Sequence, residues 1–174
     1  MFQKFYPDED VNSTYEIPFE EFYKKGIRGV IFDIDNTLVP HGAPADNRSI
    51  KLFLALHELG METCLLSNNK EPRVAAFARD AGSLKYIYKG RKPGIKGYQR
   101  AMSLMGTDSS NTIFVGDQLF TDVFGAKRAG IHSIFVRRIH PKEEIQIRMK
   151  RALESVVLHY YHKNKKTTRH EKRR

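Results

Sequence analysis

Cysteine is almost absent from this 174-residue sequence, which contains only Cys64. A single cysteine excludes an internal disulfide framework, so a reducing compartment, the cytoplasm, is the expected environment. Cys64 lies inside the apolar run 61–66, where we expect a buried structural thiol. No window approaches the ~18 apolar residues of a membrane span, and the first ten residues lack a signal-peptide pattern. We therefore expect a cytoplasmic protein without an integral membrane anchor.

Acidic residues are in the minority, with 20 Asp and Glu against 30 Lys and Arg, and the formal net charge is +10. Residues 159–174 hold seven Lys or Arg and one Glu, a net charge of +6, so more than half of the excess lies there. Such a tail can attract RNA or an anionic membrane. It is also typical of a solubilising end without a fixed partner. Both interpretations stay open.

The composition, with 40% hydrophobic and 29% charged residues, is that of a globular chain. Short apolar, β-rich segments alternate with helix-like segments, which predicts an α/β fold with a parallel sheet covered by helices. The strand candidates are residues 28–34, 61–66, 86–88, 111–115 and 132–136. The helix candidates are residues 47–59, 72–81, 94–105 and 121–129. The nearly continuous hydrophobicity of 30–32 and 112–115 predicts central strands buried on both faces.

The two ends are expected to flank a single domain. Residues 1–25 form an extension that packs on the core, with a short helix around Phe19, Phe22 and Tyr23. Residues 26–158 form the catalytic domain, and 159–174 form a basic tail without fixed structure. A last helix is predicted to begin at Pro141, and its apolar positions 145, 149, 152, 153, 156 and 157 are expected to pack on the core.

Two carboxylates, Asp33 and Asp35, follow the first apolar run at a spacing of two residues. Residues i and i+2 of an extended strand share a face, so the two side chains are expected to lie close together. The repulsion between the two carboxylates favours a binding site for a cation or a phosphate. The two side chains could also divide the roles of nucleophile and proton shuttle. The alternative is that these residues form an ordinary turn after a strand.

Polar residues follow other predicted strands as well. Ligands of parallel α/β sheets bind outside the carboxyl ends of the strands, so these residues can be considered as one set. It offers carboxylates for a metal, a hydroxyl and amides for phosphate oxygens, and a lysine. The set comprises Asp33, Asp35, Thr37, Ser67, Asn68, Asn69, Lys92, Asp117 and Asp122.

In these motifs the chain resembles the haloacid dehalogenase (HAD) superfamily of phosphotransferases. The motifs are Asp33-Ile34-Asp35-Asn36-Thr37, Leu65-Leu66-Ser67-Asn68-Asn69, Lys92-Pro93 and Gly116-Asp117-Gln118-Leu119-Phe120-Thr121-Asp122. Four motifs in the right order make the resemblance specific, and it covers roughly residues 26–136. The fold that it implies is the HAD-type Rossmann-like three-layer sandwich with a central parallel sheet.

The resemblance also implies roles for individual residues. Asp33 would be the nucleophile that becomes an aspartyl-phosphate. Asp35 would protonate the leaving alcohol and then deprotonate the attacking water. Mg²⁺ would be held by Asp33, the main-chain carbonyl of Asp35 and Asp117, together with waters and the substrate phosphate. Asp122 would lie just outside the metal ligands, as a further carboxylate or as the partner of the lysine.

Phosphate oxygens would be bound by Ser67 and by the amides after it, Asn68 first, while Lys92 would neutralise charge on the transferring group. Alternatives remain for each position. Ser67 could simply cap a helix, and Asp122 could cap the helix that it begins. Lys89 and Lys96 are rivals of Lys92.

HAD enzymes usually carry a cap domain after the first motif or between the second and third motifs. Neither gap has room here, since 40–47 is a short loop and 69–91 accommodates a helix and a short strand. The chain therefore resembles capless subclass IIIA, and an open site suits a substrate that brings its own bulk. Within that subclass, residues 25–39 and 116–123 are similar to the YqeG family, itself similar to phosphatidylglycerophosphate phosphatases.

The resemblance thus predicts a Mg²⁺-dependent phosphomonoesterase, with phosphatidylglycerophosphate as the leading substrate.

The sequence departs from the family pattern at residues 125–128, Gly-Ala-Lys-Arg, where a Gly-Asn-Arg-like run is expected. The basic tail and the aromatic residues Phe2, Phe5 and Tyr6 could hold the enzyme at the inner membrane surface, or those aromatics could pack under the last helix. The alternatives are a phosphatase acting on a protein, nucleotide or nucleic acid, and an RNA- or ribosome-associated assembly factor. The oligomeric state is left open.

Overall fold

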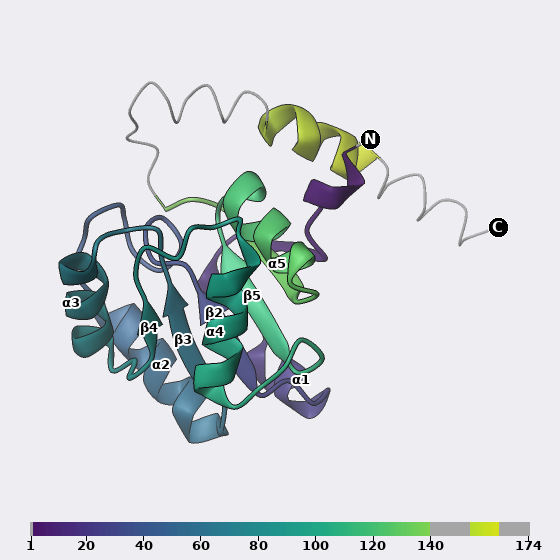
Figure 1. Cartoon of the computed structure of the whole chain (residues 1–174). Coiled ribbons are helices and arrows are strands. Elements are labelled where there is room, and N and C mark those ends of the chain that lie inside the picture. The colour runs from purple at the N-terminus through teal and green to yellow at the C-terminus, as the bar shows by residue number, and fades with distance from the viewer. Residues whose placement is uncertain (1, 140–153, 164–174) are drawn as a thin grey trace.

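The computed structural model describes residues 2–139 and 154–163. Six strands form one sheet in the order β1-β6-β5-β2-β3-β4, and all neighbouring pairs are parallel (Figure 1). The strands are β1 (Glu9–Val11), β2 (Gly29–Phe32), β3 (Glu62–Leu66), β4 (Tyr86–Ile87), β5 (Thr112–Gly116) and β6 (His132–Val136). The prediction of an α/β fold around a parallel sheet is confirmed.

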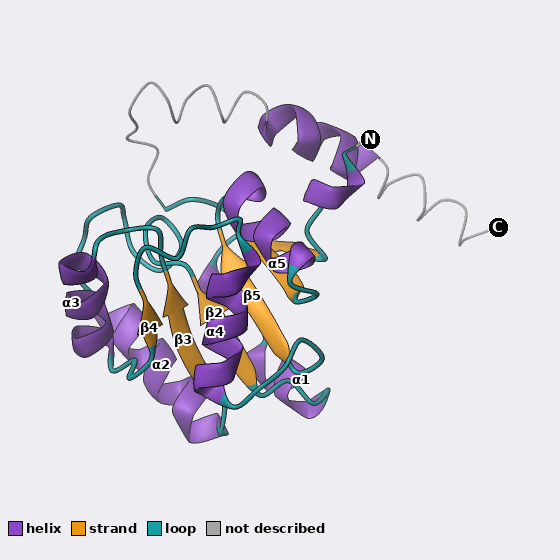
Figure 2. Ribbon diagram, viewed as in Figure 1, coloured by secondary structure: helices purple, strands orange, loops and turns teal. Residues whose placement is uncertain are grey.

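Helices cover both faces of this sheet, which makes three layers (Figure 2). One buried cluster joins the sheet to Phe19 of α1, Phe53 of α2 and Phe77 of α3. The other joins the opposite face to Tyr98 of α4 and Ala126 of α5. The helices are α1 (Phe19–Lys24), α2 (Asn47–Leu59), α3 (Glu71–Ala81), α4 (Ile95–Met105) and α5 (Phe124–Arg128). Residues 154–163 form a further helix, which we call the C-terminal helix.

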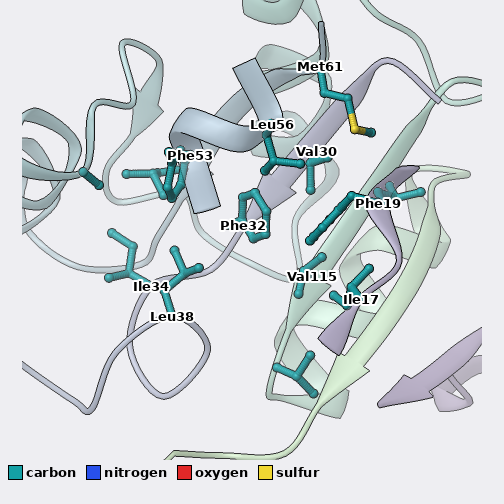
Figure 3. Packing of buried hydrophobic residues seen from close by; sticks show 14 of the residues in the cluster. Ile17, Phe19, Val30, Phe32, Ile34, Leu38, Phe53, Leu56, Met61 and Val115 are labelled. Atoms are coloured by element: carbon teal, nitrogen blue, oxygen red, sulfur yellow. The ribbon is translucent and has the colours of Figure 1, made fainter. Parts of the chain in front are cut away.

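The central strands are apolar because they are covered on both faces. Val30, Ile31 and Phe32 of β2 have no exposed surface. Val30 and Phe32 belong to the first cluster and Ile31 to the second, as the alternation of side chains in a strand requires. Figure 3 shows Phe32 between Phe19 and Phe53, whose ring centroids lie 6.0 and 5.4 Å from its own. This packing fixes the position of the carboxyl end of β2.

Several boundaries differ from the sequence predictions. β2 ends at Phe32 rather than at residue 34, because the main-chain N–H groups of Thr37 and Leu38 turn back to the carbonyl of Ile34. The segment predicted as one helix over 121–129 begins as a π-helical turn, η3 (Leu119–Val123), and continues as α5. Residues 159–163 of the expected tail are helical, while 164–174 lie outside the described residues.

The amino-terminal segment contributes a strand that the sequence did not reveal. β1 pairs with β6 as an edge strand, and the Asp8 carboxylate before it accepts from the main-chain N–H of Ser133 at 2.8 Å. Two of the three residues of β1 are acidic, which is unfavourable in strands, and the strand is short. Its formation therefore depends on tertiary contacts rather than on local propensity.

The aromatic residues near the amino terminus contact η3, α5 and the C-terminal helix. The ring of Phe5 lies 4.9 Å from those of Phe120 and Phe124, and Tyr6 lies 5.2 Å from Tyr161. Of the two alternatives for these aromatics, packing under the last helix is thus the one that the structure shows. Phe2 is partly exposed and stacks on Tyr160 at 6.2 Å.

The last helix was predicted to begin at Pro141, but its first part, with apolar positions 145, 149, 152 and 153, lies outside the described residues. Of the two predicted core positions within the described part, Val157 is buried, whereas Val156 is 46% exposed.

The predicted burial of Cys64 is confirmed. Cys64 is fully buried, and burial raises the pKa of its thiol to about 12. Within residues 2–139 and 154–163, no helix is long and apolar enough to cross a membrane.

One contact between α4 and η3 positions the fourth motif. Tyr98 is fully buried, and its hydroxyl lies 3.0 and 3.1 Å from the carbonyl oxygens of Thr121 and Asp122. Gly125 makes this approach possible, because a Cβ at that position would lie 2.4 Å from the Tyr98 hydroxyl oxygen.

Tyr98→Phe should lower the free energy of unfolding by about 1–3 kcal/mol, because it leaves buried carbonyl oxygens without their donor. Urea denaturation measures the change. Tyr88→Phe is the matched control, since Tyr88 is 39% exposed. Equal stability of the two variants would contradict this role of Tyr98.

Candidate active site

The candidate site lies at the carboxyl ends of β2, β3, β4 and β5, which meet at one edge of the sheet (Figure 1). β2 and β5 pair in register, so the residues that follow Phe32 and Gly116 are brought side by side. The sequence motifs that follow these strands are therefore neighbours in space, as parallel pairing requires.

Lys92 is the centre of the site. Its side chain is 3% exposed, and its ammonium nitrogen lies 2.7 Å from Oδ1 of Asp33 and 2.7 Å from Oδ1 of Asp122. Burial alone would lower the pKa of Lys92, but the charges of Asp122 and Asp33 raise it above its usual value. Lys89 and Lys96 are exposed. Lys92 is thus the lysine that the described structure brings to these carboxylates.

The side chain of Asn68 holds the main chain around Lys92. Its Oδ1 accepts from the Lys92 N–H at 2.8 Å, and its Nδ2 donates to the Lys92 carbonyl at 3.2 Å. The peptide bond between Lys92 and Pro93 is cis. The Asn68 amide side chain is therefore engaged with Lys92, and a phosphate contact from Asn68 would come from its main-chain N–H.

Ser67 is buried, and its hydroxyl oxygen accepts from the Asn69 N–H at 3.1 Å. It does not cap the following helix, because the residue at the amino-terminal end of α3 is Lys70.

Asp122 was alternatively expected to cap the helix that it begins. This alternative is partly confirmed, since its Oδ2 accepts from the Gln118 N–H at 3.1 Å. Asp122 thus shapes its own turn and pairs with Lys92 through the other oxygen.

Asp117 is fully buried and is contacted through both of its oxygens. Thr37 donates to Oδ1 at 3.2 Å, and the Nε of Arg138 donates to Oδ2 at 2.5 Å. Arg138 also lies 3.6 Å from Glu154, whose carboxylate accepts from the main-chain N–H groups of Leu119 and Phe120. The C-terminal helix, which Glu154 begins in the described structure, is thereby connected to the site.

Asp35 contacts a different set of groups from Asp33. Its carboxylate accepts from the Gly42 N–H at 2.7 Å, from Arg73 at 2.9 Å and from the amide side chain of Asn69. Arg73, like Arg138 and Glu154, was not identified from the sequence. No signal in the sequence identifies Arg73, because a cation in the first turn of a helix, next to Pro72, is typically exposed to solvent.

The carboxylates of Asp33, Asp117 and Asp122 form a candidate metal site. They are buried, and one ligand atom from each lies within 4.8 Å of the others. A Cβ at Gly116 would lie 2.5 Å from an oxygen of Asp122, so a glycine is needed there. Clustered carboxylate oxygens suit a hard divalent cation such as Mg²⁺. The Asp35 side chain is not in this cluster, which leaves only the expected main-chain carbonyl for a metal contact.

Burial and mutual repulsion make this cluster costly to ionise without a cation. Burial raises the pKa of Asp33 to about 6, the charge of Lys92 opposes the shift, and Asp122 adds to it. Burial, Asp122 and Asp33 raise the pKa of Asp117 well above its usual value, against the effect of Arg138. A divalent cation would relieve this repulsion, so the donor set fits the expected metal.

No cap domain is inserted at either expected position. The loop of residues 40–46 leads directly into α2, and residues 69–91 contain α3 and β4. The sequence prediction of a capless site is confirmed for the described residues.

The metal-free protein should become less stable as the pH rises from about 4 to about 6. The folded-state pKa of Asp33 lies above its ordinary value of 3.8, so the folded state binds more protons in this window and loses that advantage as the pH rises through it. Asp33→Asn should flatten the dependence, as measured by urea denaturation in a chelator. The control is Asp80→Asn, since Asp80 is exposed. A dependence unchanged by Asp33→Asn would contradict this assignment.

Arg138→Gln should destabilise the metal-free protein by about 3 kcal/mol, because Asp117 loses its cationic partner while it stays buried. Added Mg²⁺ should raise the melting temperature of this variant more than that of the wild type, since the metal supplies the missing charge. Arg137→Gln is the control, because Arg137 is the exposed neighbour. An equal rise in melting temperature in all three proteins would show that Arg138 does not balance the charge of Asp117.

Comparisons with known proteins agree with this geometry. A family model described as HAD-hydrolase-like matches residues 90–156. The probable phosphatase YqeG of Bacillus subtilis is 37% identical over 160 residues, which cover 91% of this chain and 92% of that protein. Phosphatidylglycerophosphate phosphatase 1 (chloroplastic/mitochondrial) of Arabidopsis thaliana is 27% identical over 87% of this chain, which spans only 47% of that longer protein.

Among solved structures, the 3-deoxy-D-manno-octulosonate 8-phosphate phosphatase of Moraxella catarrhalis, in complex with magnesium, phosphate and its sugar, has a TM-score of 0.50. It is 18% identical, and the alignment covers 66% of this chain and 72% of that one, which shows a shared fold. The match to YqeG extends over nearly the whole of both sequences. The chain therefore belongs to the YqeG family of HAD-superfamily phosphatases and is a phosphoric monoester hydrolase.

Proposed function

We propose that this protein hydrolyses a phosphomonoester through an aspartyl-phosphate on Asp33, with Mg²⁺ as cofactor and phosphatidylglycerophosphate as the leading substrate. The observation that carries the chemistry is the buried contact of Asp33 with Lys92, beside Asp117 and Asp122. A carboxylate in this position can attack phosphorus while the adjacent ammonium group neutralises charge on the transferring group.

The two half-reactions use the two carboxylates of the first motif. A carboxylate oxygen of Asp33 forms the bond to phosphorus as the bond to the leaving alcohol oxygen breaks, and Asp35 gives its proton to that oxygen. Asp35 then takes a proton from water, whose oxygen attacks phosphorus and returns Asp33 to its free form. Ser67 and the main-chain N–H groups after it bind phosphate oxygens, and Lys92 stays charged throughout.

Asp33 and Asp117 would hold the metal ion, with Asp122 next to them as the partner of Lys92. When bound, Mg²⁺ supplies positive charge that keeps Asp33 ionised and neutralises phosphate oxygens. The protein contributes the buried environment and the fixed carboxylate positions.

Three observations favour a lipid substrate. The relative from Arabidopsis thaliana is named for phosphatidylglycerophosphate. The site has no inserted cap, so a bulky substrate can reach it. The outer face of the C-terminal helix exposes Val156 and Tyr160, and Phe2 stacks on Tyr160, so apolar and aromatic groups are available for a membrane surface. The basic tail beyond residue 163 would add attraction to anionic lipid.

Phosphate release from phosphatidylglycerophosphate in mixed micelles tests this proposal. Wild type should release phosphate in the presence of Mg²⁺, Asp33→Asn should not, and the exposed Asp80→Asn variant should match wild type. A soluble phosphomonoester is assayed in parallel. Turnover of the soluble ester alone would keep the chemistry and reject the lipid. Inactivity on both, with salt-sensitive RNA binding that survives Asp33→Asn, would favour the RNA-associated assembly factor.

A further inference from the structure

Arg73 and His41 border the side of the site where the leaving group must lie. In the proposed mechanism Asp35 gives its proton to the leaving oxygen, so the groups around Asp35 surround that oxygen. Arg73 donates to Oδ1 of Asp35 at 2.9 Å, and Nδ1 of His41 lies 4.0 Å from the same oxygen. The exposed fraction of the side chain rises from 10% for Asp35 to 22% for Arg73 and 67% for His41. These groups therefore lead from the reaction centre out to solvent.

Arg73 is fixed in place, yet most of its donors are not engaged with Asp35. Its guanidinium lies 5.5 Å from the centroid of the Phe77 ring, and its Nη2 makes the hydrogen bond to Asp35. A guanidinium has five N–H donors in a planar fork that suits phosphate oxygens. Lys92, by contrast, is buried and lies between two carboxylates. Of these two cations, Arg73 is the one with capacity for a further anion.

The surrounding loops are strongly basic. Residues 67–73 and 88–93 contain a single acidic residue, Glu71, and three Lys or Arg in addition to Arg73 and the paired Lys92. The two loops touch, because the Lys89 N–H donates to the Asn69 carbonyl at 2.9 Å. Lys70, Lys89 and Arg91 are exposed. A second anionic group on the substrate would therefore enter a positive field on this side of Asp35.

We infer that Arg73 and His41 form a second anion-binding subsite, which selects phosphomonoesters whose leaving alcohol carries a second phosphate group. This inference rests on the proposed function, because it uses Asp35 as the acid of the leaving group. Phosphatidylglycerophosphate belongs to this class, since a phosphodiester lies on the other end of its reacting glycerol. The subsite recognises the phosphodiester itself and does not need the acyl chains.

Two soluble probes separate the subsite from the membrane. One is deacylated phosphatidylglycerophosphate, which carries the phosphomonoester and the phosphodiester, and the other is glycerol 1-phosphate, which carries the phosphomonoester alone. Wild type should have a kcat/KM at least about 10-fold higher for the first probe, as a charge-assisted hydrogen bond implies. Arg73→Gln should reduce this preference to near unity, mainly through a higher KM for the first probe, and Arg73→Lys should restore part of it.

Arg79→Gln is the matched control, because Arg79 lies on the same helix, is 76% exposed and pairs with Asp80. It should leave the preference unchanged. If Arg73→Gln lowers kcat/KM by the same factor for both probes, the inference is overturned, and Arg73 is a residue that only positions Asp35. A wild-type enzyme without a preference would also overturn it. Melting temperatures of the variants show whether each one is folded.

The outcome is independent of the lipid assignment. If the acylated lipid is not hydrolysed but the soluble preference exists and depends on Arg73, the proposed substrate is wrong and the subsite stands. If the lipid is hydrolysed but Arg73→Gln affects both probes equally, the proposed function stands and the subsite is rejected.

Discussion

The pairing of buried Lys92 with Asp33 and Asp122 is the interaction on which the site depends. Three buried carboxylates lie close to one buried lysine, so much of their charge must be balanced locally. The fold supplies this arrangement through the parallel pairing of β2 and β5 and through the Asn68 side chain, which holds the main chain of Lys92. A divalent cation would complete the balance, which would explain how the protein retains a cluster that is unfavourable without one.

Two further arginines extend this balance away from the centre. Arg138 contacts Asp117 and connects it, through Glu154, to the C-terminal helix. Arg73 contacts Asp35 and is the more exposed of the two arginines, at 22% against 16% for Arg138. Lys92 and Arg138 thus contact the carboxylates of the candidate metal site, whereas Arg73 is the cation that we propose is available to the substrate. In the proposed mechanism, this division of the site would give a capless enzyme a means of recognising its leaving group.

Much of this could be predicted from the sequence, because apolar runs specify buried strands and a parallel sheet gathers the residues that follow them. Asp33, Asp117 and Asp122 were identified for that reason, whereas Lys92 was preferred over Lys89 and Lys96 because of the family resemblance. β1 was missed because its acidic residues form a strand only against β6. Arg73, Arg138 and Glu154 were missed because no local pattern distinguishes a cation or carboxylate that reaches the site from one that faces solvent. The roles of Asp33 and Asp35 remain predictions.

The most direct test of the account is to look for phosphate on Asp33. The enzyme is mixed with Mg²⁺ and a phosphomonoester substrate, quenched in acid during turnover, and digested for peptide mass spectrometry. We predict a phosphoryl group on the peptide that contains Asp33, located on that residue, and none in Asp33→Asn. Phosphate release by the wild type without any phosphorylated Asp33, or continued turnover by Asp33→Asn, would contradict the account.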